Sequence, residues 1–186
     1  LRHFVATERR FLETGFIPLQ TEQQFSLRDE TLQIGDNPKI PLILTGKIDR
    51  IDYKADGERF IVIDYKRSGG SIIEIVNGVK NGRQFQIPIY LLMVLQKQPA
   101  KQVGGAFYYS FKDGNRTRGF MVDMKFGRTA QLTQSDLANL LAETRRQVGA
   151  ILEQIYRGNF SIAQRSEKGC QSNKCDFYDL CRMEAN

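Results

Sequence analysis

Two runs of strand-forming residues, Ile40 to Tyr53 and Arg59 to Tyr65, flank the dipeptide Asp56-Gly57. Aspartate followed by glycine is typical of a two-residue turn between antiparallel strands. With that turn, residue i faces residue 113 − i, so Asp49 lies opposite Asp64. A loop of odd length would shift the register by one residue and separate the two carboxylates. The sequence therefore predicts a hairpin with paired carboxylates toward one end.

The pleat of a strand places alternate side chains on one face, which groups Asp49, Asp64 and Lys66. The same register sets Lys47 opposite Lys66 and Ile51 opposite Val62. Two carboxylates directly across a sheet repel each other by up to about 1 kcal/mol. Mg²⁺ or Mn²⁺ between them would turn that repulsion into a site, with Lys66 orienting or deprotonating a water or stabilising phosphate charge. The alternative is that both aspartates are exposed hairpin residues in ion pairs with Lys47, Lys66 or Arg50.

The remaining sequence predicts an α/β fold (an α+β mixed sheet) with flanking helices in a single domain, residues 1–186. Strands are expected at Ile17 to Phe25, Ile40 to Tyr53, Arg59 to Tyr65, Gly104 to Phe111 and Gly119 to Met124. Helices are expected at Leu1 to Glu13, Gln84 to Gln96 and from a Thr133–Asp136 capping box to Gly158. The order strand, helix, strand around Gln84 to Gln96 predicts a crossover connection between parallel strands. Residues 159–186 form a tail of low periodicity that holds every cysteine.

Composition fits a globular protein but does not name a partner. The 27 Lys and Arg residues exceed the 21 Asp and Glu residues, for a net charge of +6, which permits a polyanionic partner. The longest apolar stretch, Ile87 to Leu95, is about half of the ~20 residues that cross a bilayer, so no membrane partner is expected. The first residues lack the features of a secretory leader and resemble the middle of a helix. We therefore expect a cytoplasmic protein and a piece of a longer chain.

The strand motifs resemble those of a known superfamily. Gly-x-Ile-Asp-Arg-Ile-Asp, starting at Gly46, followed by an apolar residue and Asp64-Tyr65-Lys66, resembles the central motifs of PD-(D/E)XK nucleases, in particular the RecB/AddB/Cas4-like branch. The resemblance implies a restriction-endonuclease-like core. It implies that Asp49 and Asp64 bind the catalytic Mg²⁺ or Mn²⁺ and that Lys66 assists the attacking water.

A third motif follows the strands. Gln86 and Tyr90 resemble the Gln-x-x-x-Tyr motif of this branch, and at spacing i, i+4 both side chains leave one helix face. Pro88 between them is tolerated only in the first turn, so we expect the helix to start near Gln84 or Phe85. Without the resemblance, these residues are better explained as a polar helix start and a core aromatic.

Weaker matches surround these motifs. Glu22 lies where the family often has a glutamate on the strand before the metal-binding aspartate, although it fits a surface position equally well. The cations Arg67, Lys80 and Arg83 are candidates for contacts with the DNA backbone. His3 is the only histidine, and its context does not match the family's metal-binding histidine.

The cysteines carry another resemblance. Cys170, Cys175 and Cys181 resemble the C-terminal cysteines that hold a [4Fe-4S] cluster in AddB- and Cas4-type nucleases. Such a cluster needs four ligands and the chain has three cysteines, so the site is incomplete in this fragment. The segment after Ser166 is then either poorly ordered or held by a substitute such as zinc. The alternative is three unliganded thiols on a tail.

The resemblance implies a metal-dependent DNA nuclease, most simply an exonuclease, in double-strand break repair and recombination. Its partners would be DNA and a helicase region or subunit, as in RecB/AddB-like helicase–nucleases. Two alternatives stay open: a catalytically silent DNA-binding or scaffolding domain of the same fold, and a Cas4-like nuclease. The intact set of Asp49, Asp64 and Lys66 favours an active enzyme over a silent one.

Overall fold

The fold is described from a computed structural model, which defines residues 2–29, 42–67, 74–112, 115–127 and 129–159. Described residues up to Glu153 form one compact unit, and Gln154 to Asn159 belong to a second unit. The elements are α1 (Arg2–Leu12), β1 (Phe16–Asp29), β2 (Leu42–Lys54), β3 (Arg59–Lys66), α2 (Ile75–Lys80), α3 (Gln86–Lys97), β4 (Gln102–Ser110), β5 (Asn115–Val122), β6 (Ala130–Leu132) and α4 (Gln134–Tyr156).

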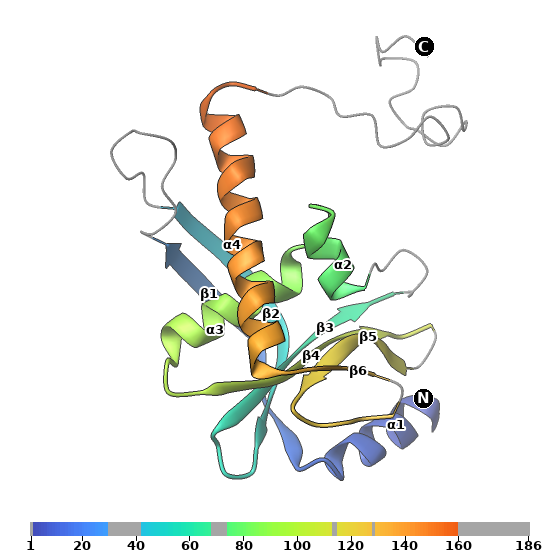
Figure 1. The fold of residues 1–186 in the computed structure, drawn as a ribbon. Coiled ribbons are helices and arrows are strands. Elements are labelled where there is room, and N and C mark those ends of the chain that lie inside the picture. Colours follow the sequence, from blue (N-terminus) through green and yellow to red (C-terminus); the bar gives the residue numbers. More distant parts are fainter. Residues whose placement is uncertain (1, 30–41, 68–73, 113–114, 128, 160–186) are drawn as a thin grey trace, which may run out of the picture. The chain divides into compact units, whose positions relative to one another are not determined.

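The six strands form one mixed sheet in the order β1-β2-β3-β4-β5-β6 (Figure 1). The β3–β4 and β5–β6 pairs are parallel and the other pairs antiparallel. The connection from β3 to β4 runs through α2 and α3, as the predicted crossover requires. The prediction of a mixed sheet flanked by helices is confirmed.

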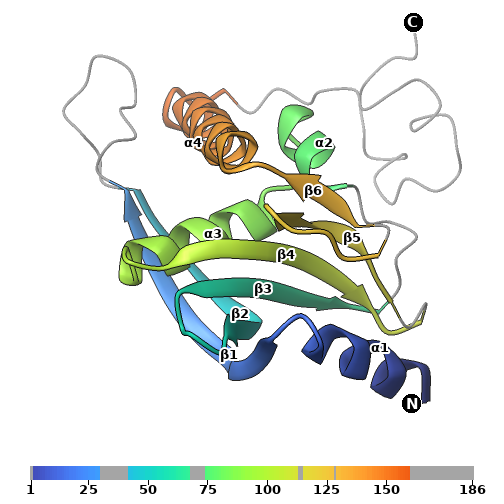
Figure 2. The same ribbon diagram turned by 60° about the horizontal axis from the view of Figure 1, so that its bottom comes forward.

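Helices cover both faces of this sheet (Figure 2). On one face α3 packs in the larger apolar cluster, which includes Ile51, Val62 and Leu91 and also takes in Leu140 of α4. On the other face α1 packs in a smaller cluster that is mainly aromatic, with Phe11, Phe107 and Tyr109. Placing Ile51 and Val62 in one cluster confirms that these residues share a face.

The turn between β2 and β3 preserves the predicted register. Backbone partners run from Tyr53–Phe60 to Arg50–Ile63, and every pair satisfies the 113 − i rule. The loop is not a two-residue turn, because its turn residues extend from Ala55 to Glu58. Because a four-residue loop, like a two-residue turn, has an even number of residues, the predicted register is kept. Gly57, with φ +73°, takes the left-handed conformation that the turn needs.

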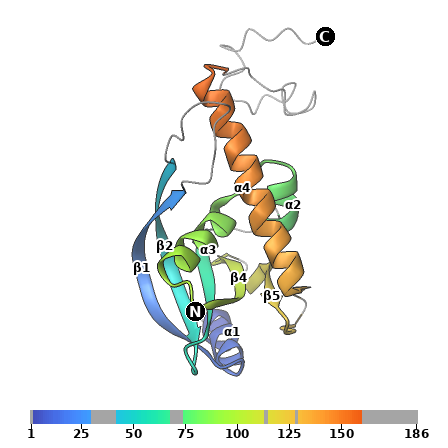
Figure 3. The same cartoon turned by 60° about the vertical axis from the view of Figure 1, so that its left-hand side comes forward.

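β1 and β2 continue together well beyond this hairpin (Figure 3). Their ladder extends to the Asp29–Leu42 pair, whereas the described pairing of β2 with β3 stops at Arg50. Positions 42–49 of β2 therefore leave β3 and run alongside β1 alone in the described sheet. This divergence opens the sheet at Asp49.

Both helices near the sequence motifs begin where expected. Phe85 is the N-cap of α3, and Pro88 occupies its first turn, where the missing N–H is no loss. Asp136 Oδ2 accepts hydrogen bonds from the Thr133 amide at 2.9 Å and hydroxyl at 2.7 Å, which confirms the capping box at the start of α4.

Three features were not foreseen. The short elements α2 and β6 have too few residues to show a period. Leu137, Leu140 and Leu141 of α4 are buried, but Ile151 and Ile155 are 42% and 49% exposed. Among the described residues, the apolar stripe of α4 is thus buried near its start and exposed at Ile151. No helix in the described ranges is long and apolar enough to span a bilayer.

Candidate active site

Asp64 is the centre of a polar group at the end of β3. Its residue is 2% exposed, and its Oδ1 accepts a 2.9 Å hydrogen bond from Gln86 Nε2. Its Oδ2 lies 2.7 Å from Lys66 Nζ in an ion pair, and a carboxylate oxygen can accept a further bond beside that one. Burial raises the pKa of Asp64, Lys66 opposes that rise, and the charge of Asp49 adds to it. Such a carboxylate is stabilised by any additional cation.

Gln86, in the first turn of α3, joins the other members of the group. Its Oε1 accepts a 2.8 Å hydrogen bond from Lys66 Nζ, and its Nε2 lies 3.0 Å from the Tyr90 hydroxyl. Because Asp64 and Lys66 are two residues apart on one strand, they share a face and meet the same amide. The structure thus brings together four predicted residues: Asp64, Lys66, Gln86 and Tyr90.

Asp49 lies where β2 leaves β3. The described ladder ends at Arg50 and Ile63, one pair before Asp49 and Asp64. The prediction that Asp49 and Asp64 are partners in the ladder is therefore not met. Instead, Asp49 Oδ2 accepts a 2.8 Å hydrogen bond from the backbone N–H of Tyr65, directly after Asp64. The Asp49 side chain thus binds the backbone of β3 just beyond the end of the described ladder. This places Asp49 beside the buried carboxylate.

The expectation that Lys47 lies opposite Lys66 is wrong. Lys47 pairs with Gln24 of β1 and forms an ion pair with Glu22. The physical reason is the divergence of β2 from β3, which a register rule for a flat hairpin does not contain. Lys66 instead binds Asp64 and Gln86.

The chemistry of these groups fits a divalent ion. Asp64 Oδ2 is a buried carboxylate oxygen with spare acceptor capacity, and the second carboxylate, Asp49, is near enough to raise its pKa. Mg²⁺ is typically held by one or two carboxylates together with substrate phosphate and water. Within the described ranges, three or more His, Cys, Asp or Glu side chains do not gather as a metal site. The donor set thus suits an ion that shares its coordination with a substrate.

The ring of Tyr108 packs against the Lys66 side chain. This contact was not predicted from the sequence. It is the β4 partner of Asp64, and its ring centre lies 5.5 Å from Lys66 Nζ. Burial raises the pKa of its hydroxyl to about 12. In the sequence Tyr108 is one of several aromatics in an apolar strand, so only the strand pairing identifies it.

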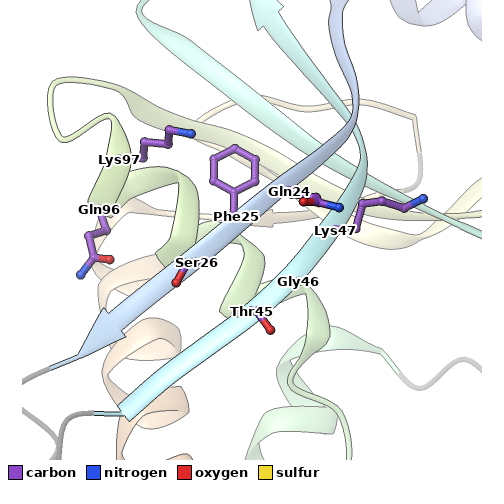
Figure 4. A pocket seen from close by; sticks show the side chains of 8 residues that line it. All are labelled: Gln24, Phe25, Ser26, Thr45, Gly46, Lys47, Gln96 and Lys97. Carbon is purple, nitrogen blue, oxygen red and sulfur yellow. The ribbon is translucent and has the colours of Figure 1, made fainter.

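Glu22 lies on β1, next to the part of β2 that leaves β3, and its side chain binds Lys47. Its φ of +54° is uncommon for a residue with a side chain, and the side chain is 61% exposed and paired with Lys47. Figure 4 shows the neighbouring groove, about 830 Å³ in volume, between the β1–β2 ladder and the end of α3. Its lining residues are Gln24, Phe25, Ser26, Thr45, Gly46, Lys47, Gln96 and Lys97. A site-adjacent role for Glu22 stays a prediction.

The three candidate DNA-binding cations are exposed and lie on different parts of the fold. Arg67 directly follows Lys66, and Arg83 lies in the turn before α3. Lys80 lines a separate cavity of about 600 Å³ together with α4 residues such as Glu143 and Arg146.

Cys170, Cys175 and Cys181 lie outside the described residues, so the iron–sulfur expectation stays a prediction.

A second buried ionic cluster lies on the α1 face of the sheet. Arg50 donates to both oxygens of Asp52, at 2.6 and 2.7 Å, and also to Glu8 of α1 and the Tyr65 hydroxyl. Asp52 is fully buried and Arg50 is 5% exposed. These residues belong to the same sequence motif as Asp49 but point to the opposite face. Their contacts fix α1 to the strand that carries the site.

The chain is similar to one known protein family and to several known proteins. The family described as the PD-(D/E)XK nuclease superfamily matches residues 1–182. A protein of Lactococcus lactis subsp. cremoris (strain SK11), named as a subunit of an ATP-dependent helicase/deoxyribonuclease, is 30% identical over 166 residues. That match covers 89% of this chain and 14% of the relative.

Two further relatives carry similar names. A protein of Lachnoclostridium phytofermentans (strain ATCC 700394 / DSM 18823 / ISDg) with the same name as the first relative is 35% identical over 116 residues, covering 58% of this chain and 9% of the relative. Exonuclease/helicase subunit RexB of Lactococcus lactis subsp. cremoris (strain MG1363) is 30% identical over 135 residues, covering 73% and 11%. The chain therefore spans about a seventh or less of the length of these relatives.

Proposed function

Because this chain belongs to the PD-(D/E)XK nuclease superfamily, we propose that it is a metal-dependent deoxyribonuclease that hydrolyses DNA phosphodiester bonds. The observation that carries the proposal is the buried Asp64 carboxylate, bound by Lys66 and Gln86 and lying beside Asp49. The Asp49 carboxylate accepts a hydrogen bond from the backbone N–H directly after Asp64, a position that a purely structural Asp64–Lys66 ion pair does not require.

In this proposal Asp49 and Asp64 hold one Mg²⁺ or Mn²⁺. When bound, such an ion polarises the phosphoryl oxygen and makes a bound water more acidic. The Lys66 ammonium, 33% exposed at its side chain, can donate to a water or to a phosphate oxygen that gains charge. Gln86 keeps that ammonium in place through Oε1, while its Nε2 fixes Asp64 and Tyr90.

We further propose that the domain works as an exonuclease in a helicase–nuclease that processes broken DNA ends for repair and recombination. The names of the relatives support a helicase partner and DNA as substrate. Arg67, Lys80 and Arg83 would bind the DNA backbone. We also propose that Cys170, Cys175 and Cys181 contribute three ligands to a [4Fe-4S] cluster, with the fourth supplied from outside these residues.

The test is cleavage of end-labelled single- and double-stranded DNA by the purified protein with Mg²⁺, with Mn²⁺ and with EDTA. We expect cleavage that requires a divalent ion and is lost in Lys66→Ala. Lys125→Ala, a change of an exposed lysine between β5 and β6, is the matched control and should cleave normally. DNA binding without cleavage under every metal condition would instead show a silent DNA-binding domain.

A further inference from the structure

An exposed aromatic ring lies directly beyond the end of β4. Phe111 is 59% exposed, although large apolar side chains are normally covered. Its ring stacks on Tyr65 with centroids 5.0 Å apart and planes 20° apart, and it also contacts Phe4 and Tyr109. More than half of the Phe111 side chain is thus exposed while the rings around it hold it in place.

The supporting ring is fixed from below. The Tyr65 hydroxyl accepts a 3.1 Å hydrogen bond from Arg50, which is locked by Asp52 and Glu8. The edge of Tyr109 also meets Tyr65, with ring centres 5.7 Å apart. A ring held this way loses little conformational entropy when a ligand stacks on it.

This stack, the Tyr65–Phe111 platform, is joined to the candidate active site through the backbone. The Phe111 amide donates a 3.0 Å hydrogen bond to Lys66 O, and the Lys112 amide donates a 3.1 Å bond to Arg67 O. Tyr65 lies between Asp64 and Lys66 and gives its own amide proton to Asp49. Figure 2 shows α1 beside this end of β3 and β4. The platform and the carboxylates therefore lie on opposite faces of one strand end.

The charges around the platform suit a polyanion. Lys66 is partly exposed, and Arg67 and Lys112 are exposed, all within one residue of the backbone bonds that hold Phe111. An exposed aromatic flanked by cations is the combination that binds unpaired nucleotides, since the rings stack on bases and the cations meet phosphates. Bases inside a duplex are already stacked and are not available to such a ring.

Resting on the proposed nuclease function, we propose that the Tyr65–Phe111 platform stacks an unpaired base of single-stranded DNA. A strand crossing the end of β3 would place its base on Phe111 and its backbone along Lys66, Arg67 and Lys112. The platform thereby favours single-stranded over double-stranded DNA. A protein partner covering Phe111 is the competing explanation for its exposure.

The experiment measures DNA affinity by fluorescence anisotropy in EDTA, which prevents cleavage, with a labelled oligothymidine and with a duplex of equal length. Phe111→Leu keeps the apolar character but removes the aromatic face, and we expect it to weaken single-strand binding by about tenfold. Phe111→Trp should restore binding, and duplex affinity should change little in either variant. Leu19→Ala alters another exposed apolar side chain, 66% exposed on β1, and should bind as the parent does.

A second readout reports stacking itself. An oligonucleotide with one 2-aminopurine should lose fluorescence on binding to the parent protein and regain it with Phe111→Leu. Equal single-strand affinity in Phe111→Leu and parent overturns the proposal, as does an equal loss for duplex and single strand. Loss of a protein–protein association with unchanged DNA binding would also overturn it, in favour of a partner surface. Mg²⁺-dependent cleavage by the parent protein is measured separately. If the parent cleaves DNA but Phe111→Leu binds as the parent does, the platform proposal is wrong and the nuclease assignment stands.

Discussion

Gln86 shows how one neutral side chain can organise a charged site. Its Oε1 accepts a hydrogen bond from the Lys66 ammonium, and its Nε2 lies within donor distance of both the Asp64 carboxylate and the Tyr90 hydroxyl. The amide oxygen therefore binds the cation and the amide nitrogen binds the anion. Gln86→Glu removes the donor and adds a charge beside a buried carboxylate. We expect cleavage to fall by about a hundredfold or more, since misplacement of catalytic groups by about 1 Å can have that effect.

The measurement is the initial cleavage rate at saturating metal and DNA. Gln96→Glu makes the same chemical change at the other end of α3, on the groove, and serves as the control. If Gln86→Glu cleaves as fast as Gln96→Glu, then Gln86 does not organise the site.

The Arg50–Asp52 pair has a structural role at the same scale. Asp52→Ala leaves the guanidinium of a residue 5% exposed with Glu8 as its remaining carboxylate partner. Breaking a buried ion pair in this way typically costs about 3–5 kcal/mol, and we expect a loss of that order in the free energy of unfolding. Urea denaturation measures it. Unchanged stability with impaired cleavage would instead assign the pair to catalysis.

At the scale of elements, the sequence was sufficient wherever local chemistry decides the geometry. The register of β2 and β3 and the place of Pro88 in the first turn of α3 are confirmed, although the loop at Asp56-Gly57 has four residues and not the predicted two. The sequence could not show that β2 leaves β3 at Asp49, because this divergence depends on the pairing of the long strand β1. For the same reason it missed the pairing of Lys47 with Glu22. It missed the Tyr108 ring near Lys66 because only the pairing of β3 with β4 brings the two together.

The capping box of α4 makes a prediction about pH. Hydrogen bonds from the Thr133 amide and hydroxyl lower the pKa of Asp136 below its ordinary value of 3.8. A carboxylate with a lowered pKa stabilises the folded state above its ordinary pKa, and this contribution is lost as the pH falls through the lowered value. Asp136→Ala should therefore lower Tm at neutral pH, by a margin that shrinks on strong acidification.

Thermal unfolding followed by circular dichroism measures both margins. Ser135→Ala, at the exposed neighbouring position, should change Tm little at either pH. A margin for Asp136→Ala that grows in acid would contradict the assignment of the ionised form as the cap.

At the scale of the whole molecule, the net charge of +6 predicts how DNA affinity responds to salt. Phosphate contacts release counterions, so the logarithm of the affinity should fall linearly with the logarithm of salt concentration. Arg83→Ala should reduce the magnitude of that slope by about one if Arg83 contacts a phosphate. Anisotropy titrations at several salt concentrations measure it. Affinity that ignores salt, or that depends strongly on base sequence, would contradict backbone recognition.

The central claim is that Asp49 and Asp64 share one divalent ion at the point where β2 leaves β3. Anomalous diffraction from Mn²⁺ in crystals of the protein locates such an ion directly. We predict one peak within about 2.2 Å of an oxygen of each carboxylate, with Lys66 still beside Asp64, and no peak there in Asp64→Asn. A Mn²⁺ peak elsewhere, or carboxylates that bind no ion while the protein still cleaves DNA, would contradict the claim.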